Sequence, residues 1–508
     1  MSLFLRGWRP YAWLALVVCV LFGPSLYFDF VCYDDNVLIR DQVEFLRQPA
    51  NTAQALTRHY FAPVTQGGRY YRPLVTLSYM TDTWLAGGKP WAYHATNVAL
   101  HLAVTCLVFL LLRLLLAEAR PALPFLGALI FAVHPLQTMA VAWIPGRNDM
   151  WLTLFMLLGL LGFIRHRETG RPGPLALHLA AFALGLLSKE SAILLPVLCA
   201  GWLWLTQIQM KPRQILQALP FYAWVSVLIL WLLTRSFALG IVMERNPPPG
   251  LGPLEQAATV AGLLLRYFGK VLFPLNLALV PDLEESTVWF GVAGLLLTAL
   301  LLWRARPPYG RIMLFGLALG FLALGLSVPF TDRMGARNLG LLEHRMYLPL
   351  VGFILALLAG LNAPRARLAP LLLLAFAANL AGITAERLPA LSGMTSFWSR
   401  AVRESPQSSD AWHNYGSMLA TDNRFGKAEQ AFLKALDLNP RRRMSHLNLA
   451  YIYNKRKHYA QAIDCVRKEL ENDPGSVKAC LVMAQNYAQS GDALRAREWR
   501  LHARQLDN

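Results

Sequence analysis

Apolar stretches alternate with short polar segments from Tyr11 to Ala385. A helix rises about 1.5 Å per residue, so about 20 apolar residues cross the ~30 Å hydrocarbon core of a bilayer. Eleven apolar runs predict transmembrane helices, near 11–29, 96–117, 121–142, 150–164, 174–188, 191–208, 216–234, 287–303, 311–329, 347–362 and 369–385. The first run has no A-x-A cleavage site and is interpreted as an anchor.

Basic residues gather in every second loop between these runs. They are Arg6, Arg9, Arg113, Arg120, Arg165, Arg167, Arg171, Lys211, Arg213, Arg304, Arg306, Arg311, Arg365 and Arg367. Lys and Arg resist translocation, so these loops and the N-terminus are predicted to be cytosolic. A twelfth span at 255–275 would invert the later loops, so that stretch is interpreted as interfacial or re-entrant. The opposite face, periplasmic or lumenal, then receives the loops at about 30–95, 235–286 and 330–346 and everything after Ala385.

The polar tail contains a repeat. Pro406, Pro440 and Pro474 are spaced by 34 residues, the period of tetratricopeptide repeats. Small and large apolar residues recur with that period, for example Gly416 and Phe432 in the first unit. The pattern predicts a membrane domain over 1–388, a linker helix over 389–406 and three helix-turn-helix repeats over 407–508. Three repeats can stack into a solenoid with a concave face for peptides or proteins. The fold class is therefore all-α.

Composition agrees with a membrane protein. Hydrophobic residues reach 55% and charged residues 15%, against a usual ~25% charged. The net charge of +18 lies in clusters between apolar runs and not in a stripe that would bind nucleic acid, so no nucleic-acid partner is expected. Six cysteines form no CxxC motif, although Cys465 and Cys480 lie on neighbouring predicted helices, which leaves a disulfide open. Phosphate-loop, dinucleotide and zincin motifs are missing, so no cofactor is required.

Ionisable residues at membrane helix ends are candidates for chemistry. Asp34 and Asp35, just beyond the first run, offer a base for a hydroxyl and a ligand for a divalent metal. A solvated loop start is the simpler alternative for this pair. Further candidates are predicted on the same face: Arg72, His94, His134, Arg147, Lys189, Glu190, Glu343, Arg345 and Tyr347. For each of these alone, capping or snorkelling is an alternative interpretation.

An ordered series of motifs carries a resemblance. It consists of Tyr71-Arg72-Pro73-Leu74, Trp91-x-Tyr93-His94-x-x-Asn97-x-x-x-His101, Phe131-Ala132-Val133-His134-Pro135, Gly146-Arg147-Asn148-Asp149, Leu187-Ser188-Lys189-Glu190, and Glu343 with Tyr347-Leu348-Pro349. This series resembles the transmembrane and tetratricopeptide-repeat O-mannosyltransferases and their bacterial relatives, polytopic glycosyltransferases of the GT-C fold. The match is closest over roughly 28–200.

The resemblance implies inverting transfer of a sugar, mannose or another hexose, from a polyprenyl-phosphate carrier to a hydroxyl on the outer face. It places the catalytic base on Asp34, with Asp35 as its neighbour and a possible metal ligand. Arg72, Arg147, Lys189 and Arg345 would meet the departing phosphate. His94, His134, Glu190, Glu343 and Tyr347 would contact substrate.

The sequence also departs from the family pattern. Met139 stands where relatives carry an acid, and His344 separates Glu343 from Arg345. These departures argue against metal assistance and leave the donor sugar open. A protein Ser or Thr is the expected acceptor, presented by the repeats. Two alternatives remain: a transferase for a lipid or glycan acceptor, and a non-catalytic membrane-anchored tetratricopeptide scaffold.

Overall fold

A computed structural model describes residues 6–31, 34–62, 70–116, 122–206, 219–239, 252–281, 287–305, 307–327, 342–362 and 368–507. Within these ranges every regular element is a helix, which confirms the all-α prediction. The chain separates into two compact units, and each is described by itself. The first comprises Met1–Leu277 and Leu283–Gly393, and the second Ala278–Asp282 and Met394–Asn508.

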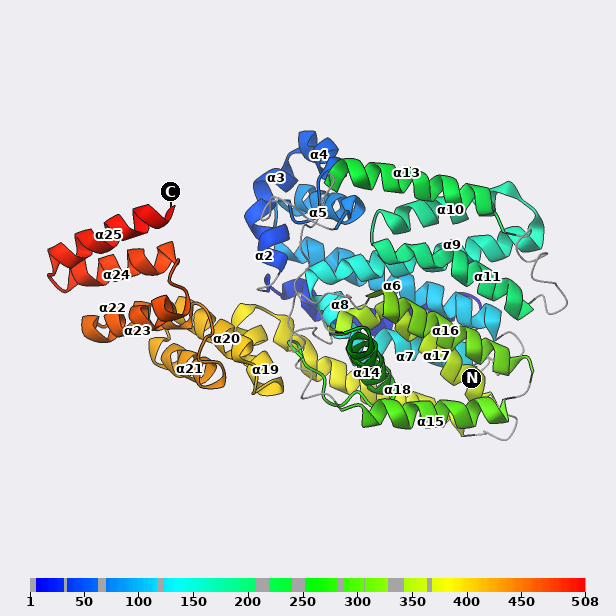
Figure 1. Ribbon diagram of the computed structural model, residues 1–508. Coiled ribbons are helices and arrows are strands. Elements are labelled where there is room, and N and C mark those ends of the chain that lie inside the picture. Colours follow the sequence, from blue (N-terminus) through cyan, green and yellow to red (C-terminus); the bar gives the residue numbers. More distant parts are fainter. Residues whose placement is uncertain are drawn as a thin grey trace. The chain divides into compact units, whose positions relative to one another are not determined.

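The first unit is a bundle of long apolar helices, with several short helices between the first long helix and the next (Figure 1). Its α-helices are α1 Arg9–Phe22, α2 Asp34–Leu38, α3 Val43–Arg47, α4 Thr52–Thr57, α5 Pro73–Ala86, α6 Pro90–Leu115, α7 Ala122–Val133, α8 Thr138–Ala142, α9 Arg147–Thr169, α10 Pro172–Leu186, α11 Leu195–Thr206, α13 Phe221–Leu239, α14 Pro253–Leu272, α15 Trp289–Arg304, α16 Tyr309–Ser327, α17 Tyr347–Leu361 and α18 Ala369–Arg387. Short 3-10 helices include η1 Gly23–Tyr27, η2 Arg40–Gln42, η3 Pro49–Asn51, η4 Pro135–Gln137, η5 Ile144–Gly146, η6 Glu190–Leu194, η7 Glu343–Met346 and η8 Leu388–Leu391.

Close helix packing holds this unit together. Helix α9 packs along α10, α6 packs on α7 and α9, and α16 packs along α17. The α16–α17 contact is tight because glycines face each other there. A Cβ atom placed on Gly316 would lie only 2.6 Å from the carbonyl oxygen of Gly352. Small residues let membrane helices approach in this way, and a larger side chain at Gly316 would separate the pair.

The predicted eleven spans are not confirmed. Among the described residues, seven helices are long and apolar enough to cross a membrane, or eight if one bent pair counts as a span. That pair is Ala122–Val133 with Pro135–Ala142, bent by 47°. Pro135 has no amide hydrogen to continue the α7 ladder, which accounts for the break. Three predicted runs fall on shorter apolar helices, Pro172–Leu186, Glu190–Thr206 and Trp289–Arg304, and at about 1.5 Å per residue a straight crossing of ~30 Å exceeds their length.

The second unit is a series of helical hairpins (Figure 1). Its helices are α19 Met394–Glu404, α20 Ser409–Thr421, α21 Phe425–Leu438, α22 Ser445–Lys455, α23 Tyr459–Asn472, α24 Val477–Gln489 and α25 Ala493–Asp507. Phe432 is fully buried against Gly416, the small and large pair expected of the repeat. The segment Ala278–Asp282 joins this unit, since the Leu279 amide donates to the Glu404 carboxylate at 2.9 Å.

Candidate functional site

The acidic pair lies at the start of α2, in a largely buried position. The carboxylate of Asp35 is fully buried and its Oδ2 accepts a hydrogen bond from the Val31 amide at 2.7 Å. Burial raises the pKa of Asp35 well above its ordinary value. Burial also raises the pKa of Asp34, to about 6, although the positive charge of Arg72 opposes the shift. Asp34 therefore changes protonation state near the pH at which a general base is most effective.

Arg72 is held beside Asp34 by aromatic rings and an acid. It is the residue that precedes α5, and its guanidinium carbon lies 4.6 Å from the centroid of the Tyr70 ring and 5.6 Å from that of Tyr60. Its Nη2 atom lies 3.3 Å from Oε2 of Glu190. Cation–π contacts and an ion pair fix the direction of a planar guanidinium while leaving some of its donors free. Accordingly, Nε of Arg72 is buried without a hydrogen-bond partner.

A second ion pair lies next to this one. Nζ of Lys189, in the turn after α10, contacts Oδ1 of Asp149 on α9 at 2.6 Å. Burial lowers the pKa of Lys189, the Asp149 carboxylate opposes that shift, and the charges of Arg72 and Arg345 lower the pKa further. The three cations are thus close enough to act on one another. The structure brings these predicted residues together although 273 positions separate Arg72 from Arg345.

This group, which we call the cation cluster, consists of Arg72, Lys189 and Arg345 with the acids Asp149 and Glu190. Three positive charges face the two negative charges of Asp149 and Glu190, and Asp34, whose carboxyl group Arg72 acts on, adds a third negative charge when it is ionised. Buried polar atoms without a hydrogen-bond partner remain on four of the five side chains: the donors Arg72 Nε and Arg345 Nη1 and the acceptors Asp149 Oδ2 and Glu190 Oε1. Buried polar groups are normally paired, so the two unused arginine donors favour an oxygen-rich ligand.

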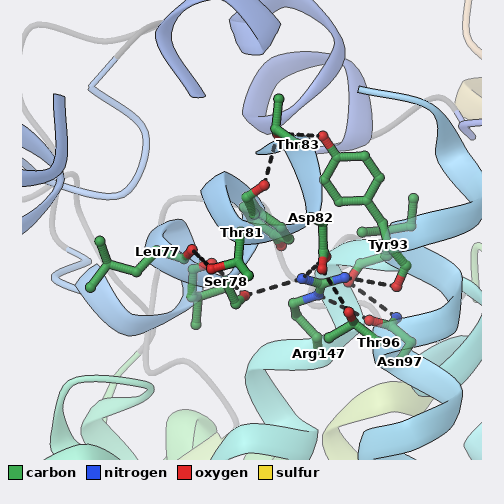
Figure 2. Close-up of polar contacts among 12 residues, drawn as sticks. Leu77, Ser78, Thr81, Asp82, Thr83, Tyr93, Thr96, Asn97 and Arg147 are labelled. Atoms are coloured by element: carbon green, nitrogen blue, oxygen red, sulfur yellow. Dashed lines mark hydrogen bonds and ion pairs between the residues drawn. The ribbon is translucent and has the colours of Figure 1, made fainter. Parts of the chain in front are cut away.

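Arg147 lies apart from the cluster in a closed network of its own (Figure 2). It is fully buried, and its Nη1 contacts Oδ2 of Asp82 at 2.6 Å. Its Nε donates to Asn97 Oδ1 at 2.9 Å and its Nη2 to the Tyr93 carbonyl at 2.8 Å. Every guanidinium nitrogen therefore has a protein partner. These contacts tie α9 to α5 and α6 and leave none of the three guanidinium nitrogens without a protein partner.

Several other predicted residues also bind protein groups. Tyr347 contacts Nδ1 of His101 through its hydroxyl at 2.7 Å. His134 accepts from the Leu136 amide through Nδ1 and contacts the Val271 carbonyl through Nε2, at 3.2 and 3.1 Å. Oε2 of Glu343 pairs with Nη2 of Arg387 at 2.9 Å.

These contacts position helix ends and occupy both ring nitrogens of His134. His94 is buried with its ring edge-on to that of Phe28, 6.2 Å between centroids. Tyr347, His134 and Glu343 are thus engaged by protein groups, whereas both ring nitrogens of His94 are buried without a hydrogen-bond partner.

Some residues of the site were missed by sequence reasoning. Tyr60 and Tyr70 orient Arg72, and Asp149 pairs with Lys189. Asp149 lies inside a motif that was recognised without being assigned a role. Tyr70 is two residues before Arg72, so the sequence alone could have predicted that the two side chains lie close together. Nothing local indicates that Tyr60 would contact an arginine twelve positions away.

An apolar groove lies beside the cation cluster. It has a volume of about 570 Å³ and is lined by residues of α4, α10 and α13, together with Tyr71 and Leu187. Tyr71 immediately precedes Arg72, and Leu187 lies two residues before Lys189. The Tyr71 hydroxyl donates to the Leu56 carbonyl at 2.9 Å, which holds one wall in place.

The predicted metal ligands do not form a complete binding site for a metal ion. Among the described residues, no three His, Cys, Asp or Glu side chains gather in a way that could hold a metal ion. Asp34 and Asp35 by themselves supply too few ligands for a site built from protein groups, because divalent magnesium or calcium takes about six or more oxygens. No chemical step below is routed through a metal.

Comparison with known proteins agrees with both parts of the sequence. Residues 396–441 and 421–477 match the family model for the tetratricopeptide repeat. The chain is 31% identical over 342 residues to human "Protein O-mannosyl-transferase TMTC2", covering 63% of this chain and 40% of the relative. It is 25% identical over 546 residues to mouse "Protein O-mannosyl-transferase TMTC3", covering 96% of this chain and 58% of the relative. It is 40% identical over 187 residues to "Protein O-mannosyl-transferase Tmtc1" of Drosophila melanogaster, covering 35% of this chain and 21% of the relative.

The chain thus resembles the protein O-mannosyl-transferases, as its motifs predict, and it spans less than two thirds of the length of these relatives. Among solved structures, the crystal structure of MamA aligns with 29% of this chain and 82% of its own, at 20% identity and a TM-score of 0.22.

Proposed function

We propose that this chain is a membrane glycosyltransferase that moves a hexose, mannose by resemblance, from a polyprenyl-phosphate carrier to a Ser or Thr hydroxyl of a protein. The reaction is placed on the periplasmic or lumenal face. The observation that carries the proposal is Asp34, a largely buried carboxyl group whose pKa is raised to about 6 beside the positive charge of Arg72. The printed names of the relatives support the transfer of mannose to protein.

The chemistry requires one base. Asp34 in its ionised form takes the proton of the acceptor hydroxyl as the oxygen attacks the anomeric carbon. The bond between that carbon and the phosphate oxygen breaks on the opposite side, and the electron pair leaves with the carrier phosphate. Attack and departure on opposite faces invert the anomeric configuration, and no sugar–enzyme bond is formed, by analogy with inverting hydrolysis.

The cation cluster suits the leaving group. The departing polyprenyl phosphate gains negative charge in the transition state, and preorganised positive groups in a site shielded from water stabilise that charge. Arg72, Lys189 and Arg345 bring three positive charges together, and Arg72 and Arg345 retain buried donors without partners. The groove beside Tyr71 and Leu187 would take the first isoprene units of the carrier, because its lining is mostly apolar.

The repeats support a protein acceptor. Tetratricopeptide solenoids offer extended concave surfaces, which suit a polypeptide better than a lipid. Transfer to a lipid or glycan and a purely anchoring role are the alternatives, and the same experiment separates them.

The test replaces Asp34 with Asn in the full chain and supplies radiolabelled polyprenyl-phosphate-mannose and membranes. Asp34→Asn keeps the size of the side chain and removes the base, so transfer to protein should fall by about 10²- to 10⁴-fold. Asp41→Asn, an exposed acid in the same outer segment, is the matched control and should retain activity. Expression and membrane insertion of both variants are measured in parallel.

The outcomes separate the alternatives. Equal transfer by Asp34→Asn and wild type would reject Asp34 as the base. Label recovered in a lipid or glycan fraction would move the acceptor to that class. Wild-type protein that transfers no mannose to any fraction would favour the scaffold.

A further inference from the structure

A second, smaller pocket lies in the outer segment that follows α1. Its volume is about 80 Å³, and it is lined by residues from α2 to α5. This is the space open to the centres of water molecules, and it is well above the ~10–15 Å³ that a single water needs, so the pocket can admit a side chain.

The pocket is one helical turn from the candidate base. Leu38, which lines it, is four residues after Asp34 on α2. Residues four apart lie on the same face of a helix, separated by about 6 Å along the axis.

Tyr60 forms a wall shared by the pocket and the proposed site. It lines the pocket, its hydroxyl lies 3.0 Å from that of Tyr79, and Arg72 lies over its ring. Burial raises the pKa of Tyr60, and the charge of Asp34 adds to that shift, which places Asp34 close to the same wall.

The lining of the pocket favours a carboxylate. Gln42, Arg58, His59 and Thr76 contribute polar groups, and no Asp or Glu is among the residues that line it. Arg58 is exposed, and its guanidinium carbon lies 5.8 Å from the centroid of the ring of Phe45, which also lines the pocket. A pocket with a cation, polar side chains and apolar residues in its lining matches the methylene stem and charged end of an acidic side chain.

We propose that this pocket selects an acidic side chain two residues from the hydroxyl that receives the sugar, in an acceptor bound in extended form. The inference rests on the proposed function. In an extended chain, residues two apart point the same way and are about 6.6 Å apart. That spacing is close to the helical turn between Asp34 and Leu38, so an acceptor hydroxyl at Asp34 would bring a side chain two residues away to the pocket.

The experiment uses the full chain in membranes with polyprenyl-phosphate-mannose and a set of otherwise identical peptides. Each peptide has one Ser or Thr and carries Glu, Gln, Leu or Lys two residues before or after it. Wild type should glycosylate one of the Glu peptides about fivefold better than the matching Gln and Leu peptides, the size expected for a partly exposed charge-assisted contact. Arg58→Ala should remove this preference without lowering transfer to the Leu peptide. Arg58→Glu should reverse it in favour of Lys.

Arg40→Ala is the matched control, because Arg40 is an exposed arginine of the same outer segment that does not line the pocket. It should keep the preference for Glu. Equal use of all peptides by wild type, or a Glu preference that survives in both Arg58 variants, would overturn the assignment of the pocket while leaving the transferase intact. Transfer to no peptide and to no protein would instead overturn the proposed function, and this inference with it.

Discussion

The ion pair between Arg147 and Asp82 allows a decisive test of whether Arg147 is structural. Both side chains are buried, and the two charged atoms lie 2.6 Å apart. Removing one partner of a buried pair leaves an uncompensated charge, which costs about 3–5 kcal/mol. Asp82→Asn and Arg147→Met should each destabilise the first unit by that amount, since each leaves the other group unpaired.

The double variant should behave differently from the sum of the single ones. With both charges gone, the remaining cost is the set of hydrogen bonds that Arg147 made to Ser78, Asn97 and the Tyr93 carbonyl, about 1 kcal/mol each. Asp82→Asn with Arg147→Met should therefore cost about 2–4 kcal/mol, well below the sum of the two single changes. Such a coupling energy is characteristic of direct contact.

The assay is thermal unfolding of the detergent-solubilised protein followed by fluorescence-detected size exclusion, together with the KM for the lipid donor in variants that remain folded. A structural role predicts a lowered unfolding temperature in each single variant, partial recovery in the double variant, and an unchanged KM. The reasoning would be refuted if Arg147→Met kept its unfolding temperature and raised the KM, because that result would make Arg147 a ligand of the donor phosphate.

Three further predictions concern other parts of the molecule. Because Asp34 must be ionised to accept a proton and its pKa is about 6, kcat/KM for transfer should fall about fivefold between pH 6 and pH 5; a flat profile down to pH 4.5 would contradict this. Val227→Trp, which fills the apolar groove, should raise the KM for long-chain donors but not for a donor with a short prenyl chain, whereas Leu232→Trp, on the same helix but outside the groove, should change neither. Phe432→Ala should destabilise the second unit by about 3–5 kcal/mol and increase its cleavage in limited proteolysis; the control Leu433→Ala, at a half-exposed position, should not.

The periodic features of the fold were predictable from sequence because they depend on local spacing. The prolines 34 residues apart and the Gly416 and Phe432 pattern indicated repeats, and the family model for that repeat matches this part of the chain. The span count was less predictable. Runs of 15 to 17 residues are apolar enough to be buried in protein or in lipid, and hydropathy does not distinguish these environments. Packing between neighbours such as α9 and α10 decides their length and angle.

The candidate site was predictable in its residue types but not in its partners. Charged residues beside apolar runs stand out because they are costly near a membrane, so Asp34, Arg72 and Lys189 could be identified from sequence. Nothing in the sequence separated Arg72, which keeps a nitrogen without a partner, from Arg147, whose three guanidinium nitrogens all have protein partners. That distinction depends on Asp82 and Glu190, which reach the two arginines from distant positions.

The amino-acid sequence by itself determined an all-helical membrane chain with a repeat tail, a resemblance to O-mannosyl-transferases, and an acidic pair just after its first apolar helix. Hydrophobic period and residue order are sufficient for these conclusions because each is a property of neighbouring residues. Only the tertiary structure decided which cations share a cluster, which are neutralised, and that a small pocket lies one turn from Asp34. Burial and pairing depend on contacts between segments far apart in the chain, and those contacts also raise the pKa of Asp34 into the range of a working base.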